Sequence, residues 1–301
     1  HQADDDELTK DLINKAVKNG RVLALGQYTQ LIGATAEDLL PAPEAEPKKR
    51  HRPRKTETKA RLYKDGKEVY RNFQGRRYID PQNPKDPDRD RFVLSKGHCA
   101  PGLYAALAQR GYFSVDELKK LRHIGAMLQG HPDMKGTPGI DMSSGSLGQG
   151  ISAACGMALA GKIDNSSYHV FSILGDGELE EGQVWEAAMF AGFYKLSNLT
   201  AFVDFNGLQI DGDIKEVMSP LPIGEKFAAF NWNVLEVNGH DIDELHDAIE
   251  KARACEDKPT VIVMHTIKGK GVAEMEGQAG WHGKAPTEEE GKKFIAEVLE
   301  V

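Results

Sequence analysis

Residues 168–206 read YHVFSILGDGELEEGQVWEAAMFAGFYKLSNLTAFVDFN and contain two short apolar runs with a helical pattern between them. The runs at 168–174 and 199–205 are rich in β-branched and aromatic residues and have the length of buried strands. Residues 181–196 carry apolar side chains close to helical spacing. A strand, a helix and a second strand form a βαβ unit, whose two strands must run parallel. The segment therefore predicts a parallel sheet covered by a helix.

Polar side chains stand where each of these predicted strands ends. Asp176, within Gly175-Asp176-Gly177, follows the first strand, and Asn206 follows the second. In open parallel sheets, ligands bind at the carboxyl ends of the strands, near helix N-termini that suit phosphate. Carboxylate and amide oxygens suit Mg²⁺ or Ca²⁺. Each motif alone is typical of a turn, but their shared place on one βαβ unit favours a metal site.

The alternation of strands and helices continues through the rest of the chain. Further strands are expected at 92–95, 234–237 and 260–264, and further helices at 102–108, 148–160 and 242–255. The pattern predicts an α/β fold, a doubly wound and mostly parallel sheet with helices on both faces. We expect one domain over residues 1–301, with a hydrophilic, basic insertion at about 41–77. Within the insertion, Asp65-Gly66 is a hairpin signal.

Composition indicates an ordinary globular chain: 40% of the 301 residues are hydrophobic and 28% are charged. The net charge of −8 argues against a nucleic-acid-binding protein. The basic run at 48–55 would suit phosphates, although a solvated loop is commoner for such a run. No apolar stretch is long enough to span a bilayer. Cys99, Cys155 and Cys255 give neither a disulfide framework nor a zinc pattern, which indicates a reducing compartment, the cytoplasm.

The segment from Gly175-Asp176-Gly177-Glu178 to Asn206-Gly207 resembles the thiamine-diphosphate fingerprint of transketolases. Matching motifs also occur at 88–98, 129–132, 144–150 and 281–286, in the family's order, so the resemblance covers about residues 78–290. It implies the thiamine-diphosphate-binding fold, with thiamine diphosphate and Mg²⁺, or another divalent cation such as Ca²⁺, as cofactors. The implied activity is transfer of a two-carbon ketol unit from a ketose phosphate to an aldose phosphate, as in the pentose phosphate pathway.

The resemblance also implies roles for individual residues. The divalent cation would be held by Asp176, Asn206 and the backbone carbonyl of Leu208. Cys99 is expected to be a small buried thiol at a helix start, and His240 to be structural. The catalytic residues would be His98, His131, His282 and Glu181, with Glu181 at a subunit interface. The cofactor-binding residues would be Ser146, Leu147, Gly148, Gly175, Asp176, Gly177, Glu178, Asn206, Lys268 and His282.

Two departures from the family pattern bear on function. Full transketolases continue into a pyrimidine-binding domain, so the chain resembles the amino-terminal subunit of a split transketolase. A separate carboxy-terminal subunit would supply that domain, in an α2β2 assembly with active sites at subunit interfaces. The family's early Gly-His-Pro-Gly motif has no counterpart, and Gln27 stands in the loosely corresponding segment. Two alternatives therefore stay open: a related thiamine enzyme with another donor or acceptor, and a non-catalytic cofactor-binding interaction subunit.

Overall fold

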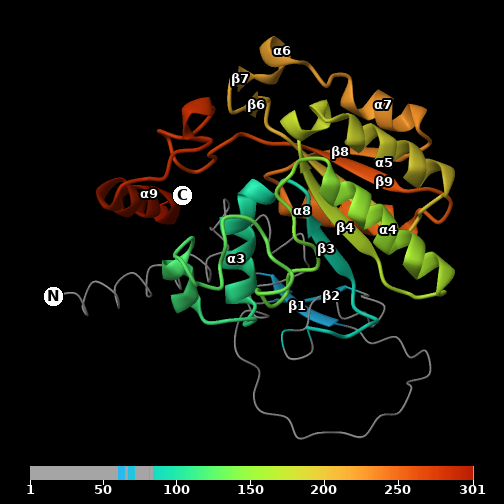
Figure 1. The fold of residues 1–301 in the computed structure, drawn as a ribbon, viewed down its shortest axis with the longest axis horizontal. Helices are drawn as coiled ribbons and strands as arrows, with labels where there is room; N and C mark the ends of the chain where they lie inside the picture. The colour runs from blue at the N-terminus through green and yellow to red at the C-terminus, as the bar shows by residue number, and fades with distance from the viewer. Residues whose placement is uncertain (1–59, 65–66, 72–80, 82–83, 301) are drawn as a thin grey trace, which may run out of the picture.

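The computed structural model describes residues 60–64, 67–71, 81 and 84–300 (Figure 1). Of the predicted insertion at 41–77, it describes two strands, β1 (Ala60–Lys64) and β2 (Lys67–Arg71). They pair antiparallel with Lys64 opposite Lys67, which confirms the predicted hairpin. The rest of the insertion, the hairpin turn 65–66 and Gln27 lie outside the described residues.

The described part of the chain forms a central sheet of five strands: β3 (Arg91–Leu94), β4 (Val170–Gly175), β5 (Leu199–Phe205), β8 (Asn233–Asn238) and β9 (Thr260–His265). The spatial order is β3-β4-β5-β9-β8, and every neighbouring pair is parallel. All carboxyl ends therefore lie along one edge. The predicted α/β fold and its βαβ unit are confirmed.

Helices cover both faces of this sheet (Figure 1). Val261 and Val263 of β9 pack into a core with α4 (Gln149–Ile163), α5 (Gly182–Phe193) and α7 (Ile223–Ala229). Ile262 and Met264 point to the other face, into a core with α3 (Ala100–Gln109) and α8 (Ile242–Ala254). Successive strand residues alternate between faces, so continuous apolar runs serve two cores at once.

Shorter elements complete the described part of the chain. They are the 3₁₀ helices η1 (Gly97–Cys99), η2 (Val115–Lys120), η3 (Gly177–Glu180) and η4 (Ala279–Trp281), the strands β6 (Leu208–Gln209) and β7 (Gly212–Asp213), and the helices α6 (Ile214–Val217) and α9 (Glu288–Glu300). Within the described ranges, no helix has the length and apolar character of a membrane span.

Close packing joins α4 to the end of β3. A Cβ added at Gly150 would lie 2.5 Å from the Cα of Ser95, closer than real Cβ atoms approach. Gly148, the N-cap of α4, has φ of +80°, a conformation that glycine adopts readily. These two glycines therefore let the loop 144–150 lie directly against the residues that follow β3.

Candidate functional site

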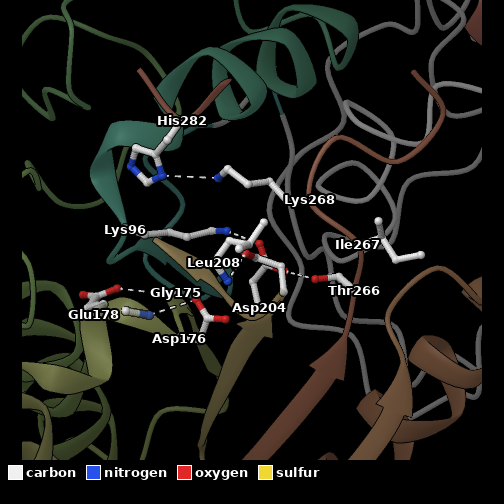
Figure 2. A network of polar contacts seen from close by, with 12 residues as sticks. Lys96, Gly175, Asp176, Glu178, Asp204, Leu208, Thr266, Ile267, Lys268 and His282 are labelled. Atoms are coloured by element: carbon white, nitrogen blue, oxygen red, sulfur yellow. Dashed lines mark hydrogen bonds and ion pairs between the residues drawn. The ribbon is translucent and has the colours of Figure 1, made fainter. Parts of the chain in front are cut away.

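A cavity of about 480 Å³ lies at the carboxyl edge of the sheet. Residues that end or follow all five central strands line it: Lys96 and His98 after β3, Asp176 after β4, Asn206 after β5, His240 after β8 and Lys268 after β9. Figure 2 shows part of this polar network at close range, with Lys96, Asp176 and Lys268 labelled. The position agrees with the predicted ligand-binding edge.

The three predicted metal ligands, Asp176, Asn206 and Leu208, all line the cavity. Asp176 is only 2% exposed, and its two carboxylate oxygens accept hydrogen bonds from the amides of Gly177 (2.9 Å) and Gly207 (2.6 Å). The Asn206 side-chain oxygen accepts from the Leu208 amide at 3.1 Å. These bonds fix Asp176 and the Asn206 turn relative to each other across the ends of β4 and β5.

Burial raises the pKa of Asp176 to about 6, against the lowering effect of the Gly207 and Gly177 amides. The charge of Asp204 raises this pKa further, and that of Lys96 lowers it. Among the described residues, no three His, Cys, Asp or Glu side chains gather as a ready-made metal cluster. The predicted metal ligands are not such a cluster, because Asp176, Asn206 and Leu208 offer one carboxylate, one side-chain amide and one backbone carbonyl.

An ion pair between a buried lysine and a partly buried aspartate forms the floor of the cavity. Lys96, 4% exposed, donates from its ammonium to Asp204 Oδ2, and the Thr266 hydroxyl donates to Asp204 Oδ1. Burial alone would raise the pKa of Asp204, but the Lys96 charge and these hydrogen bonds outweigh it, so the pKa lies below its ordinary value. Sequence reasoning missed all three residues, although a lysine and an aspartate within apolar strand ends were a usable signal.

Two histidines and a lysine form one wall. The rings of His98 and His282 stack with centroids 5.1 Å apart, and Lys268 Nζ lies 3.2 Å from His282 Nδ1. Burial, then Lys268 and His98, lower the pKa of His282 to about 4. Burial and the charge of Lys96 also lower the pKa of His98. Both imidazoles are therefore neutral at pH 7, able to donate and to accept a proton.

Glu178 is 2% exposed and joins three segments at the cavity edge. Its carboxylate accepts from the Ser95 hydroxyl and from the amides of Gly148 (2.9 Å) and Gly175 (3.1 Å). Burial raises its pKa, although these three donors act in the opposite direction. Glu178 lines the cavity, and its hydrogen bonds to the protein hold the start of α4 against the ends of β3 and β4.

The remaining predicted residues occupy different positions. Gly175, Gly177, Leu147, Lys268 and His282 line the cavity. His131, Ser146, Gly148 and Glu181 are not part of its lining. His131 is exposed, and its ring lies against Gly145, where an added Cβ would be 3.0 Å from His131 Cγ. Ser146 is also exposed, Gly148 is buried, and Glu181 is the exposed N-cap of α5.

Expectations from the sequence also concern Cys99 and His240. Cys99 lies at the start of α3 as expected, but it is only partly buried and lines the cavity, so its expected burial was wrong. The open space beside α3 leaves the thiol uncovered. His240 Nε2 accepts a hydrogen bond from the Ile267 amide at 2.7 Å, which agrees with the structural role expected for this histidine.

Comparison with known proteins relates this geometry to one family. Residues 67–297 match the family model described as transketolase, thiamine diphosphate binding domain. The chain is 50% identical over 220 residues to the 6-deoxy-6-sulfo-D-fructose transketolase subunit SqwG of Clostridium sp. (strain MSTE9), covering 73% of this chain and 80% of that protein. It is 44% identical over 223 residues to an apulose-4-phosphate transketolase subunit of Phocaeicola vulgatus, covering 73% and 78%.

A solved transketolase structure is also similar to this chain. The transketolase of Campylobacter jejuni superimposes with a TM-score of 0.70 at 33% sequence identity. The match covers 73% of this chain but only 36% of the Campylobacter chain. The chain thus corresponds to about a third of a full-length transketolase and to most of a transketolase subunit.

Proposed function

Because the chain belongs to the transketolase family and contains its thiamine diphosphate binding domain, we propose that it is the diphosphate-binding subunit of a two-chain transketolase. The enzyme would transfer a two-carbon ketol unit from a ketose phosphate to an aldose phosphate. The observation that carries the proposal is the cavity that collects Asp176, Asn206, Lys268, His98 and His282 at the carboxyl edge of the sheet.

The donor set fits a divalent cation, either Mg²⁺ or Ca²⁺. Asp176, Asn206 and the carbonyl of Leu208 offer hard oxygens, and they line the same cavity. Each Asp176 oxygen has one amide donor in the structure, and a carboxylate oxygen has a second lone pair for a metal. The cation would bind here together with phosphate oxygens.

The surrounding residues fit a diphosphate group. Gly175 and Gly177 present bare backbone to the cavity, and a Cβ at Gly177 would lie 3.0 Å from the Gln209 Cβ. Lys268 contributes positive charge, and His98 and His282 contribute ring nitrogens. Thiamine diphosphate, when bound, supplies the carbanion chemistry of ketol transfer. We assign Leu147 and Glu178, which line the cavity, to its cofactor side, and Ser146 and Gly148, which flank Leu147 in the chain, to supporting that side.

The imidazoles have the properties needed to move protons on sugar hydroxyls. The Lys268 ammonium donates to Nδ1 of His282, so the proton of the neutral ring resides on Nε2. His98 is also neutral and stacks on this ring, which fixes both planes. His131, exposed beside Gly145, is assigned to the sugar entrance, and Glu181 to a subunit interface.

The partner would be a carboxy-terminal subunit that carries the pyrimidine-binding domain. Two relatives are named as transketolase subunits, which supports a separate second chain. We propose an α2β2 assembly in which each active site lies between subunits. Three free cysteines support a reducing compartment, the cytoplasm.

The relatives' names widen the range of substrates to be tested. One is named for 6-deoxy-6-sulfo-D-fructose and the other for apulose 4-phosphate. A donor other than xylulose 5-phosphate is therefore the second candidate, and xylulose 5-phosphate remains the first.

Reconstitution tests the proposal. The chain would be co-purified with a candidate carboxy-terminal transketolase subunit from the same organism and supplied with thiamine diphosphate and Mg²⁺. Ketol transfer to ribose 5-phosphate would be measured from xylulose 5-phosphate and from 6-deoxy-6-sulfo-D-fructose. We expect transfer from at least one donor, dependent on both chains and on Mg²⁺. An assembled complex that binds the cofactor but transfers from neither donor would contradict the proposal.

A further inference from the structure

His240 is the one described cavity-lining histidine that the proposed chemistry leaves without a role. It belongs to the turn after β8, which lies against the segment after β9. The Gly239 amide donates to the His265 carbonyl at 2.9 Å, and a Cβ at Gly239 would lie 2.4 Å from Thr266 Cγ2. There is no room for a side chain at position 239, so the turn after β8 packs directly against the segment after β9.

The His240 ring makes a directed contact across this junction. Its Nε2 accepts from the Ile267 amide at 2.7 Å, while the His240 amide donates to the Asn238 side-chain oxygen at 3.0 Å. A ring nitrogen that accepts carries no proton, so His240 is neutral with its proton on Nδ1. The bond of the His240 amide fixes the backbone of this residue, and the bond to Nε2 fixes its ring.

The segment that this contact holds carries two side chains of the cavity. Thr266 donates from its amide to the Phe205 carbonyl at 3.0 Å and from its hydroxyl to Asp204. Lys268, two residues further, places its ammonium 3.2 Å from His282 Nδ1. Ile267, between them, is 44% exposed, so its side chain contributes little to anchoring the segment.

We propose that His240 is a positioning residue: its Nε2 lone pair fixes the Ile267 amide and so sets the contact between Lys268 and His282. The inference rests on the proposed function only in assigning Lys268 and His282 to the cofactor side. If His240 served only to fill space, any side chain of similar volume would preserve the Lys268–His282 contact.

The electrostatic environment agrees with a neutral His240. Burial and the charge of Lys270 lower its pKa, against opposing contributions from Asp204 and Glu276. The pKa of His282, in turn, reports on the Lys268 contact, because burial, Lys268, His98 and Lys96 lower it to about 4. Loss of the contact between Lys268 and His282 would raise the pKa of His282.

The experiment is an NMR titration of ¹³C-labelled histidines in the full chain, without metal or cofactor, so its result does not depend on catalysis. In His240→Leu, we expect the pKa of His282 to rise by about one unit. His240→Gln, whose Oε1 can accept near the position of Nε2, should keep the wild-type value. Lys268→Met alone should also raise the pKa of His282. The double variant Lys268→Met/His240→Leu should have the same pKa of His282 as Lys268→Met. His265→Gln, an exposed histidine on the same junction, is the matched control.

An unchanged pKa of His282 in folded His240→Leu would overturn the proposal. If that variant does not fold, hydrogen exchange in the wild-type chain provides a second test. The Ile267 amide should be protected at pH 7 and lose its protection as pH falls through the pKa of His240. An Ile267 amide that exchanges at pH 7 as fast as an open peptide would equally overturn it.

Discussion

The Lys96 ammonium forms a partly buried ion pair with Asp204 across the carboxyl end of β4 (Figure 2). Lys96 follows β3 and Asp204 belongs to β5, and β4 lies between them in the sheet. The Lys96 side chain runs past Gly175 of β4, where an added Cβ would lie 3.6 Å from Lys96 Cδ, an ordinary van der Waals distance. One ion pair thus joins three strand ends beneath the cavity.

Lys96→Met should destabilise the protein by about 2 kcal/mol, because it leaves the partly buried Asp204 carboxylate with the Thr266 hydroxyl but without its charged partner. The loss would appear as a lower urea midpoint with an unchanged slope. Lys292→Met is the matched control, since Lys292 and its partner Glu288 are 65% and 85% exposed, and it should cost less than about 0.5 kcal/mol. Equal effects of the two substitutions would mean that the Lys96 pair is not buried in solution.

Two glycines of α4 should respond oppositely to alanine. Gly150→Ala places a Cβ against the Ser95 backbone and should cost about 2 kcal/mol or more. Gly156 is exposed with no atom near the added Cβ, so Gly156→Ala should stabilise the helix by about 0.5–1 kcal/mol. Thermal unfolding of both variants measures the difference. Stabilisation by Gly150→Ala would contradict the close contact between α4 and β3.

The affinity for Mg²⁺ should depend on pH through Asp176. Its folded pKa of about 6 lies above the ordinary 3.8, so its contribution to the stability of the metal-free protein is largest below pH 3.8 and falls as pH rises through 6. Because Mg²⁺ binds the ionised form, its affinity should rise about tenfold per pH unit below pH 6 and level off above it. Thermal shift with Mg²⁺ and inorganic pyrophosphate at pH 5–8 measures this. A pH-independent Mg²⁺ shift would contradict the assignment.

Substitution of His131 should affect only the reaction with the sugar phosphate, whereas substitution of His282 should also weaken cofactor binding. In the reconstituted enzyme, His131→Ala should lower kcat/KM for the sugar phosphate about 10²-fold and leave the Kd of thiamine diphosphate unchanged, because His131 lies outside the cavity lining. His282→Ala should impair both quantities. His265→Ala, at an exposed histidine outside the lining, is the control. A weaker Kd for the cofactor in His131→Ala would place this histidine in the cofactor site instead.

Local patterns predicted the βαβ unit because β4, α5 and β5 lie close together in the chain, with only η3 between β4 and α5, and each obeys its own periodicity. The positions of Asp176 and Asn206 follow from that unit alone, since the register pairs Gly175 with Asp204. These features needed no knowledge of the remaining topology.

Contacts that depend on strand order were not predictable in the same way. β9 inserts between β5 and β8, although β8 comes before it in the chain. That insertion brings Thr266 to Asp204 and the Ile267 amide to His240. The Lys96–Asp204 pair joins residues 108 positions apart, and no periodicity in the sequence encodes such a pairing.

The proposed function requires the cavity to hold a diphosphate through a divalent cation on Asp176. Titration calorimetry of thiamine diphosphate into the full chain, at protein concentrations suited to weak binding, tests it most directly. The control is Asp247→Asn, at a side chain that is 71% exposed on α8. We expect binding that requires Mg²⁺, is abolished by EDTA and by Asp176→Asn, and is retained in Asp247→Asn. Equal binding by Asp176→Asn and the wild-type chain, or binding unaffected by EDTA, would contradict the claim.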